Sequence, residues 1–528
     1  MLPRRLIAIV LAMGILAGLG AVAYALGSGG RRPANPSPST QRPNSKPQHP
    51  PRYRTFYISY LRGRDSNSGR SRGRPWRLAP GMVGFTGNYQ HRPGDHFIFE
   101  GGVTWPNAAF PLAVTGSGIA GKGDYYGTDD SWFVGPRFTR PVFSAQNSPI
   151  VGPDLNGANN ERLGGENDVF VDLNGHDYIT VDDIAFTGFD ADSRKHTYSY
   201  ANCAVINADG NGDGADQHIV IKRIFVTSVY VDQASATSGC FAVAAYTNPP
   251  YGGSSLIEDS VIAGGGQSYL GGVRCFGNIE DNDIHDMPWL ILPCGHGEIA
   301  SNNLYDCGVP AFPTEGGPPS SFHADAFQVN GADGKFYIHD NVIHDTAFNS
   351  TESAECEAML LGNPGETDYV WNNVLYGIGG NSIGLTQASA PGVAAYFWNN
   401  SIEGGLSGRE PCVRSERAGR YSAVEVVNNL CITTDGVLTA GLDADRLGIG
   451  HNLTLSPAHA TESGLGAGLP YVFSPQRNEA AVPNAGQNLS GLCVGPLRQL
   501  CHDTTYAGRR AARPRPRSGS WSVGAYER

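Results

Sequence analysis

The sequence has few charged residues and lacks a long amphipathic helical pattern. Charged residues make up 16% of the chain and hydrophobic residues 40%. Beyond the N-terminus, no long window carries apolar residues at helical spacing, which argues against a helical protein. Glycine and proline, with 70 and 35 copies, punctuate the chain evenly after the first fifty residues. The composition therefore predicts an all-β chain without a second compositional region.

Two further absences exclude whole classes of function. No cysteine pair is separated by only two residues, which excludes the clustered ligands of a zinc finger. The net charge is −11, and no basic stripe offsets the repulsion from phosphate, which argues against nucleic acid as a partner. An acidic polysaccharide would need a local cluster of Arg or Lys side chains.

The N-terminus reads as an export signal. Arg4 and Arg5 precede an apolar run from Leu6 to Leu26, which ends near Ala23-Tyr24-Ala25. These are the basic region, the hydrophobic region and the small-residue cleavage site of a signal peptide, expected over residues 1–30. Because the run is about 20 residues long, it could also remain as an anchor. Either outcome predicts an extracytoplasmic protein that meets a membrane only through this segment.

One pattern recurs along the middle of the chain and sets the expected fold. It consists of an apolar residue, two variable residues, Asn, one variable residue and a second apolar residue, as in Ile279 to Ile284. Its asparagines are Asn282, Asn302, Asn341, Asn373, Asn400, Asn429 and Asn452. Earlier, degenerate copies place Ser260, Lys222 and Asp182 at the same position.

The spacing of these asparagines predicts a solenoid. The shortest interval is 20 residues, whereas a β-propeller blade uses four strands in about 40 residues. We therefore expect one coil per repeat, with strands stacked at about 4.8 Å. An Asn at every corner would adopt the left-handed turn conformation and form a hydrogen-bonded column.

The two ends of the chain resemble a known group of secreted proteins. Near the start stand Phe56-Tyr57-Ile58-Ser59, Gly63 to Gly69, Pro75-Trp76, and Pro93-Gly94-Asp95 to Gly101-Gly102. The end reads Val523-Gly524-Ala525-Tyr526-Glu527. These segments are similar to the pectate-lyase-like, right-handed parallel β-helix superfamily. The resemblance covers most of residues 55–528, and it implies polysaccharide lyases, glycoside hydrolases, epimerases or inert adhesin-like proteins.

The resulting organisation is a single solenoid with covered ends. Residues 31–54, rich in proline, form a linker. We expect residues 55–110 to form an N-terminal cap and the first strands, 111–456 the parallel β-helix, and 457–528 a C-terminal tail that covers the last coil. All ten cysteines lie between Cys203 and Cys501. We expect disulfides between Cys203 and Cys240, Cys275 and Cys294, and Cys493 and Cys501, with buried free thiols as the alternative.

A candidate site follows from aligning the coils on their asparagine corners. His323 and Asp325 then project from one face of a strand, with Ala324 and Ala326 on the other. Glu355 and Glu357 occupy the equivalent positions in the next coil. An insertion at Gly308 to Ser321 comes immediately before His323. The predicted catalytic residues are His323, Asp325 and Glu357. The predicted substrate-binding residues are Arg274, Gln328, Lys335 and Glu355.

Several chemistries fit such a site. Carboxyl groups about 5 Å apart suit a retaining glycosidase. They also suit a Ca²⁺ ion, which in a lyase neutralises a uronate while a base such as His323, Lys335, Arg274 or Arg414 removes a proton. Aromatic rings at Trp289, Tyr305, Trp371 and Trp398 could stack on sugars. The alternative is a solvated strand face without chemistry.

A second pattern resembles half of a calcium-binding loop. Asp209, Asn211 and Asp213 alternate with glycines, as the oxygen ligands of such a loop do. The twelfth position is Val220, where an EF-hand needs a glutamate. A glycine-rich turn is therefore the alternative to a Ca²⁺ site.

Taken together, these patterns predict a secreted or surface-anchored monomer that acts on polysaccharide, acidic polysaccharides included. Cleavage by a lyase or hydrolase is the leading hypothesis. A non-catalytic glycan-binding or adhesin-like solenoid is the alternative.

Overall fold

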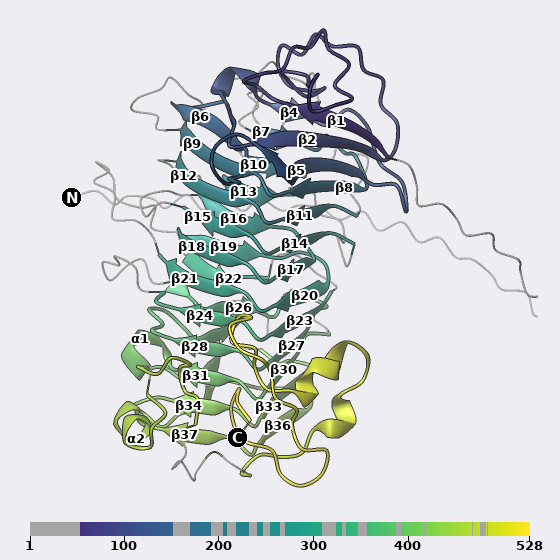
Figure 1. Ribbon diagram of the computed structural model, residues 1–528. Coiled ribbons are helices and arrows are strands. Elements are labelled where there is room, and N and C mark those ends of the chain that lie inside the picture. Colours follow the sequence, from purple (N-terminus) through teal and green to yellow (C-terminus); the bar gives the residue numbers. More distant parts are fainter. Residues whose placement is uncertain are drawn as a thin grey trace, which may run out of the picture. The chain divides into compact units, whose positions relative to one another are not determined.

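In the computed structural model, short strands of successive coils stack into long parallel sheets (Figure 1). The structure describes residues 53–150, 169–191, 204–208, 218–231, 240–245, 254–264, 270–308, 324–329, 334–346, 356–386, 392–416, 419–466, 468–475, 482 and 484–527. Residues 52–528 form one compact unit. The predicted right-handed parallel β-helix is confirmed.

Each coil contributes one strand to each of three faces. Sheet 1 has 13 strands in the described part, in the order β1 (Arg54–Ile58), β2 (Asp95–Gly101), β5 (Asp124–Phe133), β8 (Ile179–Asp182), β11 (Val220–Lys222), β14 (Leu256–Glu258), β17 (Asn278–Glu280), β20 (Gly297–Ala300), β23 (Lys335–His339), β27 (Thr367–Trp371), β30 (Ala394–Trp398), β33 (Ala423–Val427) and β36 (Leu447–Gly450). Sheet 2 has 12, in the order β3 (Thr104–Trp105), β6 (Val142–Ser148), β9 (Ala185–Ala191), β12 (Phe225–Val231), β15 (Val261–Ala263), β18 (Asp283–Met287), β21 (Asn303–Cys307), β24 (Val342–His344), β28 (Val374–Tyr376), β31 (Ser401–Glu403), β34 (Leu430–Ile432) and β37 (Leu453–Leu455).

Sheet 3 completes each coil and is built in two parts. Its first eight described strands are β4 (Leu112–Ala113), β7 (Val169–Asp172), β10 (Ala204–Asn207), β13 (Phe241–Ala244), β16 (Gly271–Arg274), β19 (Trp289–Leu292), β22 (Ala324–Phe327) and β25 (Cys356–Glu357). Four more continue it, β26 (Met359–Leu361), β29 (Ile383–Leu385), β32 (Val413–Ser415) and β35 (Thr439–Ala440). A bridge from Gln328 to Leu360 joins the two parts.

Helices are few and short in the described residues. They are α1 (Gly405–Gly408), α2 (Pro457–Glu462) and three 3₁₀ turns, η1 (Asn107–Ala109), η3 (Ser490–Leu492) and η4 (Gly495–Cys501). No helix in this part of the chain has the length and apolar character needed to cross a membrane. The predicted signal segment and most of the predicted linker lie outside the described residues.

The core is a stack of aliphatic side chains that point into the solenoid. In sheet 1 one such column runs through fully buried residues in register from coil to coil: Ile221, Ile257, Ile279, Ile299, Ile338, Val370, Phe397 and Val426. β-Branched side chains pack well at this position because they suit the pleated surface of a sheet.

The predicted asparagine column is present at the corner between sheets 1 and 2. From Asn282 to Asn452, the side-chain amide of each asparagine donates to the side-chain oxygen of the next at 2.9–3.1 Å. Each amide also donates to a backbone carbonyl of the preceding coil, as Asn373 does to Ile338 at 2.9 Å. The column satisfies the polar groups that the turn buries.

The left-handed turn, however, lies one residue earlier than predicted. Asp281, Asn372, Asn399 and Asn428, each directly before a column asparagine, have φ of 56°, 57°, 55° and 61°. A two-residue corner needs one residue to reverse the chain, and that residue faces outward, so the next one can point inward and join the column.

The register of the two earliest degenerate copies was also wrong. Ile221, and not Ile219, pairs with Ile257, and Val181 pairs with Ile221. The corner positions are therefore Ile224 and Ile184, not Lys222 and Asp182. Both isoleucines are buried, so apolar packing replaces the hydrogen-bonded column in these coils.

Removing an asparagine from the middle of the column should destabilise the fold measurably. For Asn373→Ala we expect a loss of about 2–3 kcal/mol in the free energy of unfolding, because its buried partners lose hydrogen bonds. Asn452→Ala is the matched control. Asn452 ends the column and is only half-buried, so water can replace it and the loss should stay below about 1 kcal/mol. Equal losses in urea denaturation would contradict the role of the column.

The N-terminal motif residues build the cap over the first coil. The Trp76 ring stacks on Phe56 with a centroid distance of 4.7 Å, and its indole N–H donates to the Asn67 carbonyl at 2.8 Å. Asp65 accepts the N–H groups of Arg77 and Leu78 at 2.9 and 3.0 Å. A Cβ at Gly63 would lie 2.0 Å from the Trp76 carbonyl oxygen, so the glycine is required there.

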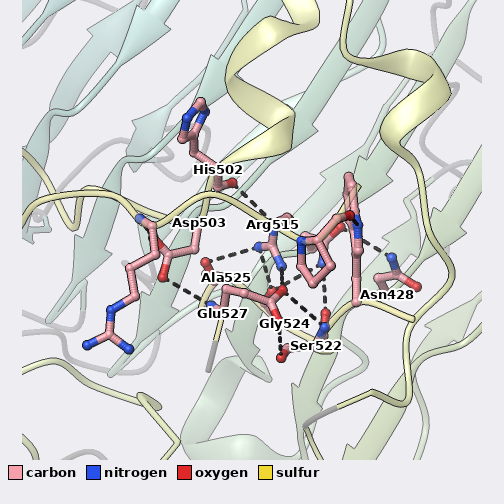
Figure 2. Close-up of polar contacts among 12 residues, drawn as sticks. Asn428, His502, Asp503, Arg515, Ser522, Gly524, Ala525 and Glu527 are labelled. Atoms are coloured by element: carbon pink, nitrogen blue, oxygen red, sulfur yellow. Dashed lines mark hydrogen bonds and ion pairs between the residues drawn. The ribbon is translucent and has the colours of Figure 1, made fainter. Parts of the chain in front are cut away.

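The C-terminal segment lies along the side of the solenoid, where the outward corner asparagines hold it (Figures 1 and 2). Asn372 donates to the His502 carbonyl at 2.9 Å, Asn399 to Ser522 at 3.1 Å, and Asn428 to Gln487 at 2.8 Å. In each pair of corner asparagines, the inward one therefore forms the column, and the outward one binds the C-terminal segment.

The same segment leaves the last strand of sheet 1 open. Leu447 and Ile449 of β36 are 47% and 49% exposed, although their partners Val424 and Val426 are buried. The segment therefore covers the outer faces of sheets 1 and 2, and not the edge of β36.

Among the described residues, three disulfides join neighbouring coils, and a fourth, Cys493–Cys501, closes a short loop in the C-terminal segment. They link Cys275 to Cys294, Cys307 to Cys356, Cys412 to Cys431, and Cys493 to Cys501. The predicted pairs 275–294 and 493–501 are confirmed. Cys240 is also disulfide-bonded, whereas Cys203 lies outside the described residues. Such bonds fit an oxidising compartment.

Candidate functional site

Two columns of side chains project outward from sheet 3. One of them runs from Trp289 through Asp325 to Glu357, which pair in register between β19, β22 and β25. Ala324 and Ala326 belong to the interior core instead. The predicted stacking of Asp325 and Glu357 in adjacent coils is therefore confirmed. The Asp325 side chain is fully buried, whereas Glu357 is half-buried.

The column continues below Glu357 into a cluster with a second carboxyl group. The amide nitrogen of Asn381 lies 3.0 Å from Glu357 Oε1 and 2.8 Å from Glu416 Oε1. Because one nitrogen donates to both, the two carboxyl oxygens are no farther apart than the sum of these contacts. Glu416 is half-buried, so both groups border solvent.

One arginine orients this cluster. Arg414 of β32 donates to the Asn381 carbonyl oxygen at 3.0 Å and to Glu410 at 3.2 Å. The contact fixes the amide of Asn381 so that its nitrogen faces the two glutamates. A Cβ at Gly384 would lie 2.7 Å from Glu416 Oε1, so the glycine makes room for that carboxyl group over the sheet.

The cluster keeps one carboxyl group protonated at neutral pH. Burial, and then the negative charges of Asp325 and Glu416, raise the pKa of Glu357 to about 8. Its Oε2 atom is buried and accepts no hydrogen bond from the described residues. Glu357 can therefore donate a proton at a pH where an ordinary glutamate cannot.

No protein-family model matches the sequence, and no curated protein matches it. Three solved structures are similar to it at low identity. A GH136 lacto-N-biosidase from Eubacterium ramulus is 12% identical with a TM-score of 0.47, over 76% of this chain and 67% of that chain. Pectate lyase Pel9A is 12% identical with a TM-score of 0.40, over 90% and 96%. A variant of the PL6 family alginate lyase AlyGC is 14% identical with a TM-score of 0.40, over 70% and 49%.

These similarities do not transfer an activity to this chain. The β-helix that the terminal motifs imply is confirmed by the register of the sheets and by the asparagine column. What the chain does must be argued from its own side chains.

The predicted substrate-binding residues divide between two sheets. Arg274 and Gln328 occupy the second outward column of sheet 3, since Arg274 pairs with Leu292 and Gln328 bridges to Leu360. The Arg274 guanidinium lies 5.4 Å from the centre of the Phe241 ring. Lys335 begins β23 in sheet 1, so the structure does not bring it to the carboxyl groups.

Several predicted residues lie outside the described part of the chain. They are His323, Glu355, the insertion beyond Gly308, and the three calcium-loop residues Asp209, Asn211 and Asp213. Among the residues that the structure describes, no group of three or more His, Cys, Asp or Glu side chains is arranged to hold a metal ion. A calcium site at 209–213 stays a prediction.

Two of the predicted aromatic contacts have a structural role. Trp371 and Trp398 are 0% and 3% exposed, and they pack with Leu489, Leu500 and Trp521 of the C-terminal segment. They hold this segment against sheet 1, so their faces are closed to a sugar.

Sequence reasoning missed Asn381, Glu416 and Glu410. Asn381 and Glu410 lie in turns from sheet 2 to sheet 3, and Glu416 directly follows β32, where the turn to sheet 1 begins. The lengths of these turns vary from coil to coil. The asparagine corners therefore do not fix their register. The alternation in Arg414-Ser415-Glu416 is the signal that indicates two outward charges on one strand.

A second group of titratable side chains lies on sheet 1 and serves docking. His339 contacts Asp340 at 2.7 Å and Glu298 at 2.9 Å. Burial alone would lower the pKa of His339, but hydrogen bonds to these two carboxylates raise it to about 9. Asp340 also accepts the Thr505 N–H at 2.9 Å, so the group fastens the C-terminal segment.

Proposed function

We propose that the protein hydrolyses a neutral extracellular polysaccharide at the outer face of sheet 3. The observation that supports this most directly is the pair Glu357 and Glu416 around the Asn381 amide, with Glu357 protonated at neutral pH. Two neighbouring carboxyl groups, one of them with a raised pKa, are the acid and the nucleophile of a glycoside hydrolase.

The roles of Glu357 and Glu416 follow from the proton that Glu357 carries and from the position of Glu416 beside it. Glu357 donates its proton to the glycosidic oxygen as the bond to the anomeric carbon breaks. A carboxyl oxygen of Glu416 attacks that carbon, and a water molecule, deprotonated by Glu357, then releases the sugar. The shared amide keeps the two carboxyl groups close together, which favours the retaining mechanism over the inverting one. Asp325 is a buried positioning residue: its negative charge raises the pKa of Glu357.

The local charge favours a neutral sugar over a uronate. Among the described residues, the cluster brings together the carboxyl groups of Asp325, Glu357, Glu410 and Glu416 with one arginine, Arg414. A lyase must neutralise the uronate carboxylate with a cation before a base removes the adjacent proton. Among the described strands of sheet 3, Arg274 is the other cation, and it lies three coils above Glu357, which leaves a uronate facing carboxyl groups.

A polysaccharide panel tests the proposal. The purified chain, incubated with neutral and acidic polysaccharides, should release reducing ends from a neutral one without absorbance near 235 nm, which the unsaturated product of a lyase would give. Absorbance at that wavelength would show that the protein cleaves by elimination, as a lyase does, and not by hydrolysis. Binding to the panel without either product would leave the non-catalytic glycan binder, which the half-buried polar side chains of Arg274, Gln328 and Glu416 on this face support.

The pH dependence should reveal the acid. Glu357 must carry its proton, so kcat/KM should fall as the pH rises through about 8, the pKa of this group. In Asp325→Asn the pKa of Glu357 should drop, since one of the negative charges that raise it is gone. The alkaline limb of the pH profile should then move to lower pH. If the alkaline limb does not move, Asp325 does not influence the pKa of the catalytic acid.

Export belongs to the same proposal. The disulfides between coils and the apolar segment at residues 6–26 support an extracytoplasmic protein, secreted or held at the surface. We expect a monomer.

A further inference from the structure

An open groove lies far from the carboxyl cluster, at the corner between sheets 1 and 2 in the first coils. It has a volume of about 1360 Å³ and is open to solvent. Its lining runs from Thr55 and Tyr57 of β1 to Arg223, which precedes β12, and Phe225, the first residue of β12. Since these strands are successive rungs about 4.8 Å apart, the groove runs along the solenoid axis. Its direction suits an extended polymer chain.

Aromatic rings form much of its floor. Tyr57, His96 and Tyr125 come from the first three strands of sheet 1. Phe225 comes from sheet 2 and is 38% exposed, one of the few large apolar side chains in the described chain with an open face. Exposed rings bind the apolar faces of sugar rings by burying area.

Polar groups between the rings are fixed in place. The buried Asp182 accepts the Tyr125 hydroxyl at 3.0 Å and an Arg223 N–H at 2.5 Å. At the next corner position, Asp183 accepts the Thr128 hydroxyl at 3.0 Å and pairs with Arg140 at 2.6 Å. Such pre-oriented donors and acceptors bind hydroxyl groups at low entropic cost.

The walls of the groove are also braced. Arg72 pairs with Asp129 on one wall, and the Trp132 ring meets Tyr57 edge to face at 5.1 Å. On the other wall, the Gly102 N–H donates to the Thr139 carbonyl at 2.8 Å. Gly102 has φ of 72°, and a Cβ there would lie 2.5 Å from the Val134 carbonyl oxygen. The glycine pair of the N-terminal motif thus holds the loop that bears Arg137 and Arg140.

The corner is open here because the C-terminal segment occupies it only in later coils. Ser301, Asp340, Asn372, Asn399 and Asn428, the outward corner residues of those coils, all hydrogen-bond to that segment. In the first coils the equivalent residues, Asp183 and Arg223, face the groove instead.

The lining has no net charge. Its charged residues are Arg137, Arg140, Arg223, Asp129, Asp130 and Asp183. An anionic chain would meet as many carboxylates as guanidinium groups, whereas the hydroxyl groups of a neutral sugar can bind both.

We propose that this groove is a second, non-catalytic binding site for a neutral polysaccharide chain, with Phe225 and Arg137 as contact residues. It holds one part of the polysaccharide along the first coils, while another part of the same polysaccharide reaches other sites on the solenoid. The proposal does not require that Glu357 and Glu416 hydrolyse the polymer.

The test measures binding without turnover. In full-length Glu357→Gln protein, retardation in native gels containing xylan, β-glucan or polygalacturonate gives the apparent affinity. We expect binding to a neutral polymer that Phe225→Ala and Arg137→Ala each weaken by about tenfold, with little dependence on salt. Val494→Ala, which removes a side chain 70% exposed on the C-terminal segment, is the matched control and should bind as the parent does.

Each result of this experiment either supports the groove proposal or overturns it. Unchanged binding in both groove variants, or no retardation of the parent by any neutral polymer, would overturn the proposal, as would tighter binding of polygalacturonate that salt abolishes. Arg137 is exposed and its side chain forms no hydrogen bond or ion pair among the described residues, so its variant should fold even if Phe225→Ala does not. If the wild-type protein cleaves nothing but the groove variants lose binding, this inference stands and the hydrolase proposal fails.

Discussion

Replacing Glu357 by glutamine is expected to lower the rate of polysaccharide hydrolysis by about 10²–10⁴-fold, the usual contribution of a general acid. Glutamine keeps the size of the side chain and can still interact with Asn381, but it cannot transfer a proton. Its amide removes a buried acid whose ionised form is unfavourable, so the fold should be at least as stable at neutral pH. Reducing-end release under saturating substrate, compared with thermal unfolding of the same sample, measures both effects.

A control separates chemistry from charge. Glu425→Gln removes a half-buried carboxyl group from β33 in sheet 1, outside the cluster, and should leave the rate within twofold of wild type, roughly the scatter of such surface changes. If Glu357→Gln hydrolyses the polymer at the wild-type rate, then Glu357 is not the acid. A loss of activity in Glu416→Gln alone would place the chemistry on the other carboxyl group.

The second large effect is expected at Arg515, whose replacement by methionine should cost about 3–5 kcal/mol of unfolding free energy. Arg515 is 3% exposed and donates to Glu527 at 3.1 Å, to Asn372 at 3.0 Å, and to three backbone carbonyls of the C-terminal segment (Figure 2). Methionine would leave the Glu527 carboxylate buried without its cation.

Arg517 provides the matched control, because it lies two residues away with an exposed side chain. Arg517→Met should change the unfolding free energy by less than about 0.5 kcal/mol. In urea denaturation, the double variant Arg515→Met/Glu527→Gln should recover part of the loss, since the uncompensated charge is gone. A loss for Arg515→Met no greater than for Arg517→Met would show that the segment is held by its apolar contacts instead.

The end motif of the sequence has a physical basis in this network. Gly524 has φ of 85°, and a Cβ there would lie 2.7 Å from Ser401 Oγ. The next residue, Ala525, donates its N–H to the same hydroxyl at 3.0 Å. Glu527 then receives Arg515 and Ser522. The motif therefore encodes docking of the chain end to the solenoid and carries no chemistry of its own.

The sequence by itself determined the solenoid, because an Asn that recurs at coil length leaves few other folds. It also determined that Asp325 and Glu357 lie in adjacent coils, since side chains alternate along strands whose positions the corners fix. It could not show that the residue before each column Asn takes the left-handed conformation, because asparagine and aspartate tolerate it at either position.

The tertiary structure alone decided where the cluster ends and what covers the corner. Asn381 and Glu416 reach Glu357 across turns of unequal length, and a one-residue shift in such a turn would reverse the face of every side chain after it. Likewise, Arg515 meets Asn372 across 143 positions of sequence. Contacts between coils depend on hydrogen-bonded register and packing, and these are set only when the strands lie side by side.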